Sequence, residues 1–286
     1  MQKQKTLKSR LSMPEVLVAP GVYDALTALI AEQAGMEAVF LSGSSVSYSQ
    51  IARADIGLIT MNEIADVCAR ICDRVEIPVL VDVDSGFGNA AHAARTMRVM
   101  ERAGAAAIQI EDQLPIKPSN DLKGRPLVTA QIMADKIKAL VDARRNENTL
   151  ISARSDSPAS ESLEQVIERI LIYKEAGADL LFAEGLEHED EVARVVQAVA
   201  DTPVVYNLLR GNTELKSAEQ LESLGVSVAL FPGNAILSVG KVLQDTFSDL
   251  KENPTLPEEG FAISGADFNT MIGTSDILNK YKNFAG

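Results

Sequence analysis

Residues 79–89 read VLVDVDSGFGN and residues 103–113 read AGAAAIQIEDQ, and these two segments indicate the architecture of the chain. In each, a short apolar run typical of a buried parallel strand ends in carboxylates, with Asp82 and Asp84 in the first and Glu111 in the second. Buried acids are costly unless they serve a common site. A barrel of alternating strands and helices collects the ends of its strands at one mouth, so the pattern favours a (β/α)8 TIM barrel in the α/β class.

The same alternation recurs from one end of the chain to the other. Helical spacing lies over Glu63–Val75, Ala91–Ala103, Ile132–Ala143 and Leu163–Ala176. No GxGxxG motif follows the first apolar run, which disfavours an open dinucleotide-binding sheet. The apolar runs predict eight strands: Val16–Ala19, Ala38–Ser42, Val79–Val83, Ala106–Glu111, Leu150–Arg154, Leu180–Ala183, Val204–Asn207 and Val228–Phe231.

The composition excludes several classes of partner. The net charge of −13 works against binding to nucleic acid or to anionic lipid, because phosphate contacts need clustered Lys and Arg. No stretch approaches the roughly 20 apolar residues of a membrane span, and the N-terminus lacks the apolar core of a signal peptide. Cys68 and Cys72 lie four apart in a helical pattern that suits free packing thiols better than a disulfide. We expect a cytoplasmic protein that binds a small molecule.

The carboxylates predict a metal site. Asp82 and Asp84 are two residues apart and so face the same way in a strand, and a neighbouring strand brings Glu111 close. Three carboxylates repel one another unless a cation or protons intervene. Ligands that offer only oxygen favour Mg²⁺, or Mn²⁺, over zinc. The alternative is that these acids cap the helices that follow, with Asp84 before SGFGNA.

Other polar groups end the remaining strands: Ser42-Gly43-Ser44, Arg154, Glu184 and Asn207. Arg154 ends an otherwise apolar run and could bind a carboxylate through two parallel hydrogen bonds. Its alternative role is a salt bridge to Asp156 or Glu184. The two histidines, His92 and His188, lie in helical or polar contexts, which argues against a Ser-His-Asp triad or a multi-histidine metal site.

Seven motifs follow one another along the chain: FLSGSSVS (40–47), ADIGLIT (54–60), VDVDSGFGNA (81–90), AGAAAIQIEDQ (103–113), ISARSD (151–156), AGADLLFAEG (176–185) and GVSVALFPGNA (225–235). Through these motifs the chain resembles, over about residues 10 to 250, the isocitrate lyase and phosphoenolpyruvate mutase superfamily. The resemblance implies a (β/α)8 barrel whose last helix is exchanged between subunits, in a homotetramer built as a dimer of helix-swapped dimers. We therefore expect one barrel domain over 1–286, with 252–286 as a C-terminal helical tail.

The resemblance also implies roles for single residues. Asp84 would hold Mg²⁺, with Asp55, Asp82 and Glu111 acting through its waters. The ion would act as a Lewis acid on the oxygen that becomes an enolate. The substrate would be bound by Ser42, Gly43 and Ser44 at its carboxylate and oxo group, by Arg154 at a carboxylate, and by Glu184 and Asn207 elsewhere.

The chain departs from the superfamily pattern in the loop after the fourth strand. Lyases carry a cysteine there as the general acid, whereas this chain has Ser119 two residues after Lys117. A hydroxyl is a poor proton donor compared with a thiol. Phe40 replaces a tyrosine of the lyases, and Gln113 replaces a lysine of the mutases. The candidate catalytic residues are Asp55, Lys117, Ser119 and Arg154.

These features predict an enzyme. The leading hypothesis is a Mg²⁺-dependent carbon–carbon lyase that acts on a small 2-oxo- or 2-hydroxy-dicarboxylate through an enolate. Because the loop cysteine is missing, decarboxylation ranks ahead of aldol-type lysis. The runner-up is a phosphonopyruvate-type P–C mutase or hydrolase. A third hypothesis is a carboxylate-binding barrel that has lost turnover.

Overall fold

The computed structural model describes residues 7–114, 117, 125–209, 213–256, 262–282 and 284. It divides the chain into two compact units, Met1–Leu237 and Ser238–Gly286. The predicted catalytic residue Ser119 lies outside the described residues.

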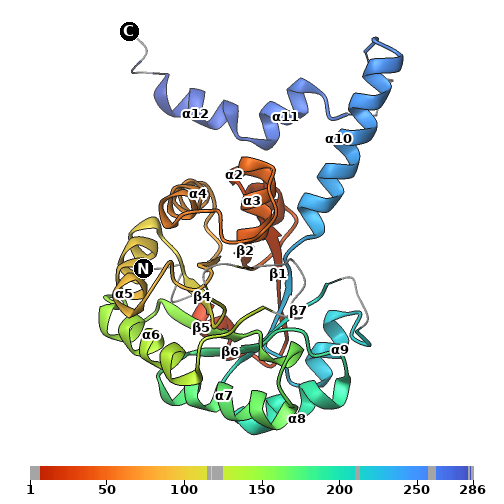
Figure 1. The fold of residues 1–286 in the computed structure, drawn as a ribbon. Coiled ribbons are helices and arrows are strands. Elements are labelled where there is room, and N and C mark those ends of the chain that lie inside the picture. The colour runs from red at the N-terminus through yellow and green to blue at the C-terminus, as the bar shows by residue number, and fades with distance from the viewer. Residues whose placement is uncertain are drawn as a thin grey trace. The chain divides into compact units, whose positions relative to one another are not determined.

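The first unit is a closed barrel of eight parallel strands (Figure 1). Each strand pairs with the next in the sequence, and β8 returns to pair with β1. The predicted strands are confirmed; β1 runs on further than expected, and β2 stops before Ser42 because that residue caps the next helix. The strands are β1 (Leu17–Val22), β2 (Val39–Leu41), β3 (Val79–Asp82), β4 (Ala107–Glu111), β5 (Leu150–Ser155), β6 (Leu180–Ala183), β7 (Val204–Asn207) and β8 (Val228–Phe231).

Helices alternate with the strands and surround them (Figure 1). Side chains cap several of them; Thr60 and Ser162 each form a capping box with the residue three positions on. Gly104 ends α5 at φ +98°, where an added Cβ would lie 2.8 Å from the Cys72 Cβ. The helices of this unit are α2 (Ala25–Gln33), α3 (Gly43–Ile51), α4 (Met61–Arg74), α5 (Ala90–Ala103), α6 (Ala130–Ala143), the 3₁₀ helix η1 (Ser157–Ala159), α7 (Leu163–Glu175), α8 (Glu189–Val199) and α9 (Ala218–Ser223).

Helix α10 (Asn234–Glu252) begins in the first unit and continues into the second, which also contains α11 (Gly265–Met271) and α12 (Thr274–Tyr281). None of the helices in the described part of the chain combines the length and the apolar composition needed to cross a membrane.

The strands change from apolar to polar along their length, and this change positions the site. Strand β4 shows it best, since Ala107 belongs to the buried apolar cluster whereas Gln109 and Glu111, which share its face, are buried polar residues. On β5, Leu150 lies in the same cluster and Arg154 ends the strand. The apolar filling therefore occupies the amino-terminal end of the strands and leaves the carboxyl end polar.

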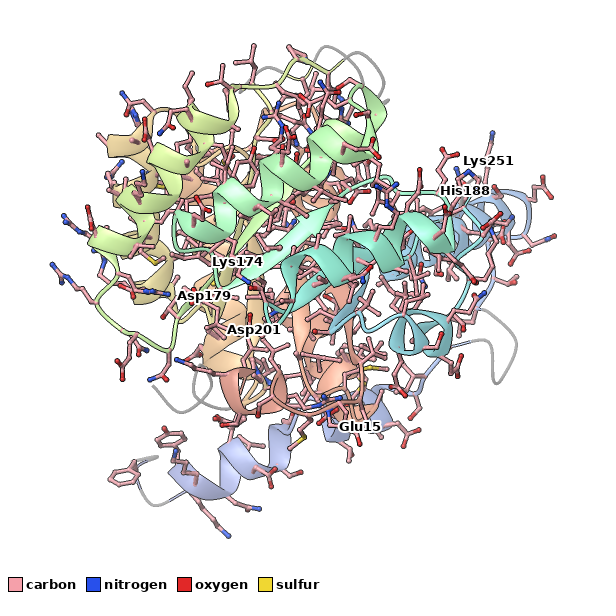
Figure 2. The ribbon with its side chains drawn as sticks, turned by 90° about the horizontal axis from the view of Figure 1, so that it is seen from below. Glu15, Lys174, Asp179, His188, Asp201 and Lys251 are labelled. Atoms are coloured by element: carbon pink, nitrogen blue, oxygen red, sulfur yellow. The ribbon has the colours of Figure 1, made fainter. Side chains whose placement is uncertain are left out.

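Two ion pairs lie near the amino-terminal ends of the strands. Lys174 Nζ lies 3.2 Å from Asp201 Oδ1, and Arg144 Nη1 lies 2.6 Å from Asp179 Oδ2 (Figure 2 labels Lys174, Asp179 and Asp201). The first pair is exposed and therefore contributes little to stability, whereas the second is partly buried. Cys68 and Cys72 form no disulfide, as the sequence predicts, and their sulfur atoms lie 3.9 Å apart.

Candidate metal and substrate site

Three carboxylates converge at the carboxyl ends of β3 and β4. One oxygen each from Asp82, Asp84 and Glu111 lies within 4.8 Å of the others. The register explains the meeting: Asp82 pairs with Gln109, and two residues on, Glu111 N donates to Asp84 O at 2.9 Å. The structure thus brings the three predicted residues together. Asp84 does not cap the next helix, because Asn89 caps α5.

Burial disfavours the charged form of the carboxylates in this cluster. It raises the pKa of Asp82 to about 8, and the charges of Asp84 and Glu111 add to the effect. It also raises the pKa of Asp84 to about 6, although the ammonium of Lys117 works against it. Burial would raise the pKa of Glu111 too, but Lys117 and Arg154 outweigh it and hold that pKa below its usual value. The carboxylates therefore compete for positive charge.

A tight turn directs Asp84 into the cluster. Asp84 has φ +47° and Phe87 has φ +59°, left-handed conformations that are unusual for residues other than glycine. Gly86 between them has φ +82°, and a Cβ there would lie 2.9 Å from Ile110 Cδ1. Lys136 is buried on α6, and its Nζ donates to Ser85 O at 2.8 Å, which holds the turn in place. Strained residues of this kind concentrate at functional sites.

Lys117 places an ammonium among the carboxylates. Its Nζ lies 2.6 Å from Asp84 Oδ1, 3.2 Å from Glu111 Oε1 and 3.3 Å from Asp55 Oδ2, and only 4% of its side chain is exposed. These acids hold the Lys117 pKa above its usual value despite burial. The structure thus brings the predicted residues Asp55 and Lys117 to the cluster.

The cluster fits a divalent cation. Its ligands are oxygen atoms alone, which suits a hard cation such as Mg²⁺. Glu111 Oε1 is buried and has no hydrogen bond of good geometry within the described residues, only the ion pair with Lys117. A buried, weakly partnered carboxylate oxygen is costly and calls for a cation.

The start of α3 borders the acids. Ser42 caps the helix, and its Oγ lies 3.0 Å from Ser44 Oγ. Gly43 N donates to Asp82 Oδ2 at 3.3 Å, and an added Cβ on Gly43 would lie 3.0 Å from that oxygen. The backbone N–H groups at a helix start favour anions. The three residues predicted to bind substrate therefore lie together beside the acids.

Arg154 lies on the other side of the cluster. Its Nε lies 2.6 Å from Asp156 Oδ1 and 3.6 Å from Glu111 Oε2, and its Nη1 lies 3.8 Å from Glu184 Oε2. The guanidinium also lies over the Phe182 ring, 5.3 Å from its centre. Asp156 and Glu184, the two acids of the alternative salt-bridge role, thus both lie near Arg154, and they orient its guanidinium toward the acid cluster.

Glu184 and Asn207 form a pair at the ends of β6 and β7. Asn207 Nδ2 donates to Glu184 Oε2 at 2.7 Å. Asn207 Oδ1 is buried without a hydrogen-bond partner among the described residues, so it can accept one from a ligand. Burial raises the pKa of Glu184. The predicted residues Glu184 and Asn207 therefore border the same site.

Sequence reasoning missed the residues behind the site. Asp112 accepts from Ser155 Oγ at 2.6 Å, from Tyr173 OH at 2.7 Å and from Asp156 N at 3.0 Å. These bonds hold β5 and the loop that carries Asp156. The sequence contains an indication of this role in the Glu111-Asp112 pair. Because neighbouring residues in a strand face opposite sides, only one of the two side chains can point into the barrel, and the other must find partners behind it.

Arg125 was also missed. Its Nη1 donates to Gln113 Oε1 at 3.2 Å, and Gln113 Nε2 donates to Asp156 Oδ2. The Arg125 charge lowers the pKa of both Glu111 and Glu184, which places it within the field of the site. In the sequence, only the position of Arg125 after the loop that follows β4 could have indicated this role. His92 and His188 stay at helix starts, outside the site, as expected (Figure 2 labels His188).

Comparison with known proteins gives consistent matches. Residues 7–251 match the family model described as phosphoenolpyruvate phosphomutase. The chain is 34% identical to 2,3-dimethylmalate lyase of Eubacterium barkeri over 286 residues, which cover 100% of this chain and 99% of the relative. It is 40% identical to 2-methylisocitrate lyase of Aeropyrum pernix over 253 residues, 87% of this chain and 80% of the relative. A crystal structure of 2,3-dimethylmalate lyase, a member of the PEP mutase/isocitrate lyase superfamily, superposes with a TM-score of 0.93 at 28% identity, covering 100% of this chain and 96% of that one.

Proposed function

Because the chain belongs to the phosphoenolpyruvate phosphomutase family, within the PEP mutase/isocitrate lyase superfamily, we propose that it is a Mg²⁺-dependent carbon–carbon lyase. Its substrate is a small 2-oxo- or 2-hydroxy-dicarboxylate, and the bond breaks to release an enolate. The observation that carries the proposal is the meeting of Asp82, Asp84 and Glu111 beside Arg154 at the carboxyl ends of the strands.

The acidic residues would hold the metal, with Asp84 as the direct ligand and Asp55, Asp82 and Glu111 acting through water molecules. When bound, Mg²⁺ supplies a Lewis acid for the substrate oxygen on which negative charge develops. Mn²⁺ prefers the same oxygen ligands and is expected to substitute for it. The left-handed turn at Asp84 supports this assignment, because it directs the carboxylate into the cluster.

The substrate is bound by groups that surround the metal. The start of α3, with Ser42, Gly43 and Ser44, binds one carboxylate and the oxo or hydroxy oxygen. Arg154 binds a carboxylate, oriented by its bonds to Asp156. Glu184 and Asn207 bind the remainder of the substrate, since Asn207 Oδ1 is free to accept a hydrogen bond.

Lys117 stabilises negative charge and does not donate a proton. Its neighbours raise its pKa, so the ammonium is a weak acid at neutral pH. Proton transfer to the enolate therefore depends on solvent or on Ser119. Replacement of Ser119 by Cys tests this point: a gain of aldol-type lysis is expected if only the donor is lacking.

The proposal is tested by incubating the protein and Mg²⁺ with oxaloacetate, 2-methylisocitrate, 2-alkylmalates and phosphonopyruvate. Release of pyruvate or another oxo acid is followed by a coupled assay, and phosphorus NMR reports on the P–C bond. Asp84→Asn should abolish turnover, whereas Asp66→Asn, on the exposed face of α4, should not. Cleavage of none of the carbon acids by the wild-type protein refutes the proposal, and a change in the phosphorus spectrum alone selects the mutase alternative.

We also propose that 1–286 is one barrel domain with a C-terminal helical tail, and that the last helix is exchanged in a dimer of helix-swapped dimers. Large apolar side chains that are more than half exposed support it: Val242, Phe247 and Leu250 on α10, and Ile277 and Leu278 on α12. Apolar residues on this scale mark a protein–protein interface. Light scattering on the full chain should give four times the chain mass, and a monomer would contradict the proposal. We also propose a cytoplasmic location, which is supported by thiols that stay reduced rather than forming a disulfide.

A further inference from the structure

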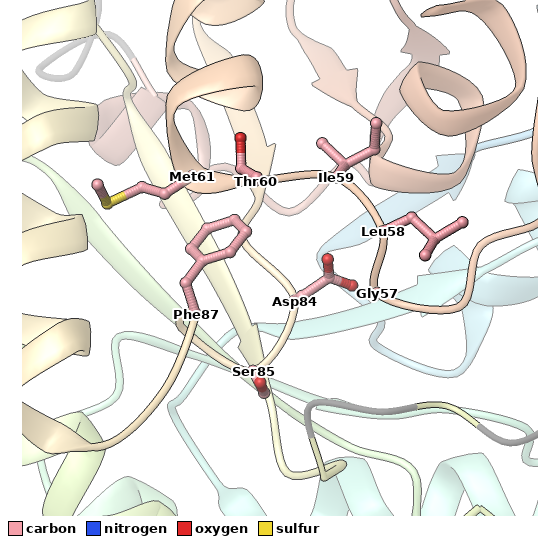
Figure 3. A pocket seen from close by; sticks show the side chains of 8 residues that line it. All are labelled: Gly57, Leu58, Ile59, Thr60, Met61, Asp84, Ser85 and Phe87. Carbon is pink, nitrogen blue, oxygen red and sulfur yellow. The ribbon is translucent and has the colours of Figure 1, made fainter. Parts of the chain in front are cut away.

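The acid cluster is enclosed differently on its two sides. On the Asp84 side it borders a cavity of about 360 Å³, whose lining includes Leu58, Asp84 and Phe87 (Figure 3). Arg154 is not among the described residues that line this cavity, and only 12% of its side chain is exposed. The Arg154 side is therefore packed with protein, and the groups that surround the guanidinium determine where it lies.

Asp156 determines the orientation of Arg154. Arg154 Nε donates to Asp156 Oδ1 at 2.6 Å, and Arg154 Nη2 donates to Asp156 Oδ2 at 3.2 Å. The contacts of the guanidinium with Glu111 and Glu184 are longer, at 3.6 and 3.8 Å. Two parallel hydrogen bonds fix the plane of a guanidinium as well as its position. Because one edge of the group faces Asp156, the end with Nη1 is the part turned toward a ligand.

Gln113 holds the Asp156 carboxylate. Its Nε2 donates to Asp156 Oδ2, the same oxygen that accepts from Arg154 Nη2. The backbone of Asp156 is fixed separately, since its N donates to Asp112 Oδ1 at 3.0 Å. Gln113 is 1% exposed and Asp156 is 2% exposed, so neither side chain can exchange its partner for bulk water. The direction of the Asp156 carboxylate therefore depends on Gln113.

Arg125 decides which end of the Gln113 amide faces Asp156. Arg125 Nη1 donates to Gln113 Oε1 at 3.2 Å. A guanidinium has donors only, so the amide oxygen must face Arg125 and the amide nitrogen must face Asp156. A reversed amide would set two donors against each other at Arg125 and two acceptors against each other at Asp156. The antiparallel bridge between Gln113 and Leu127 also holds the backbone of Gln113 beside the segment that follows Arg125.

From these contacts we infer that Gln113 is a positioning residue, which acts through Asp156 to orient the Arg154 guanidinium toward a carboxylate of the ligand, and that Arg125 orients Gln113. Neither Gln113 nor Arg125 needs to touch the ligand for this role. The inference rests on the proposed function, in which Arg154 binds a carboxylate. A buried glutamine that only stabilised the fold would affect unfolding, but its effect on ligand binding would not depend on Arg154.

The test is a double-mutant cycle between Gln113→Met and Arg154→Lys. Dissociation constants for oxalate are measured by calorimetry on the full chain with saturating Mg²⁺. Gln113→Met keeps the length of the side chain and removes both amide hydrogen bonds, so it should weaken oxalate binding about tenfold. Arg154→Lys keeps the charge and loses the two parallel hydrogen bonds to Asp156. In that background Gln113→Met should weaken oxalate binding by less than about twofold, because the group that transmits its effect is missing.

A matched control and a second cycle accompany this measurement. Gln131→Met removes an exposed glutamine on α6 whose Nε2 also donates to an aspartate, Asp135 Oδ1 at 2.8 Å, and it should leave oxalate binding unchanged. Arg125→Met replaces Gln113→Met in the same cycle if the latter does not fold. It should weaken oxalate binding about threefold in the wild-type background only. Arg125→Lys keeps a charged donor for Gln113 and should bind oxalate as the wild-type protein does.

The outcomes separate the inference from the proposed function. Equal weakening by Gln113→Met in the wild-type and Arg154→Lys backgrounds overturns the inference and leaves the lyase proposal standing, because Gln113 then acts independently of Arg154. Unchanged oxalate binding by a folded Gln113→Met variant overturns it as well. Failure of the wild-type protein to bind oxalate with Mg²⁺ present, or no effect of Arg154→Lys on oxalate binding, contradicts the proposed site itself.

Discussion

Replacement of Lys117 by Met should make the metal-free protein less stable and its metal affinity higher. Met keeps the length of the side chain and removes the charge. In the metal-free structure the Lys117 ammonium contacts Asp84, Glu111 and Asp55 at 2.6 to 3.3 Å. The carboxylates of Asp84 and Glu111 also belong to the group that can hold a metal. The ammonium and Mg²⁺ therefore compete for them.

The size of the effect follows from burial. Removal of one partner from a buried ion pair costs about 3–5 kcal/mol, because the remaining charge is left uncompensated. Asp82 and Asp84, with pKa values raised to about 8 and about 6, can take up protons and relieve part of this cost. We therefore expect a loss near the lower limit, about 3 kcal/mol. In a chain of this size each kcal/mol lowers Tm by about 2 °C or more, which gives a decrease of about 6 °C.

The assay combines thermal unfolding with calorimetric titration of Mg²⁺. The variant should bind Mg²⁺ at least about tenfold more tightly, since the ion no longer displaces a positive charge, and saturating Mg²⁺ should restore most of the lost stability. Lys138→Met, on the exposed face of α6, controls for loss of a lysine, and Lys117→Arg keeps the charge. Unchanged Tm and unchanged Mg²⁺ affinity in Lys117→Met would refute the reasoning.

Three further results are expected. Without metal, the Asp82 carboxyl binds its proton more tightly in the folded than in the unfolded protein, so its contribution to stability falls as pH rises from about 4 to about 8. Because Mg²⁺ must displace that proton, calorimetry should show the Mg²⁺ affinity rising by up to about tenfold per pH unit and levelling off above about pH 8. In urea unfolding, Asp112→Asn should lower the free energy of unfolding by about 2–4 kcal/mol, because it disturbs three buried hydrogen bonds. Tyr173→Phe should lower it by about 1–2 kcal/mol, because it removes one of them. Gly43→Ala should weaken oxalate binding about tenfold in calorimetry at unchanged Tm, since its Cβ would lie 3.0 Å from Asp82 Oδ2.

The barrel could be predicted because its strands are short apolar runs that end in polar groups. A strand buried on both faces has little freedom in composition, so Leu180–Ala183, Val204–Asn207 and Val228–Phe231 appear in the structure with the predicted bounds. The start of α3 could not be placed as well, because Ser42 reads equally well as the end of a strand or as a helix cap.

The acid cluster could be predicted from spacing, whereas its cation could not. Asp82 and Asp84 are two residues apart, which predicted that they face the same way in a strand. In the structure β3 ends at Asp82, and the left-handed turn at Asp84 brings the second carboxylate to the cluster. Lys117 and Arg125 lie beyond the strands, where no repeat fixes the direction of a side chain, so their approach to the cluster depends on the loop backbone. The direction of the Phe87 side chain could not be predicted for a related reason, because it depends on a left-handed backbone that no pattern of apolar residues reports.

The charges of the site bear on the order of binding. The carboxylates of Asp55, Asp82, Asp84, Glu111, Asp156 and Glu184 outnumber the cations Lys117, Arg125 and Arg154. Burial also raises the pKa of Asp156 to about 7, and the charges of Glu111 and Glu184 add to the effect. A dicarboxylate that enters this field before a metal would meet net repulsion, whereas a divalent cation would meet attraction and reverse the local sign. We therefore expect the metal to bind before the substrate anion.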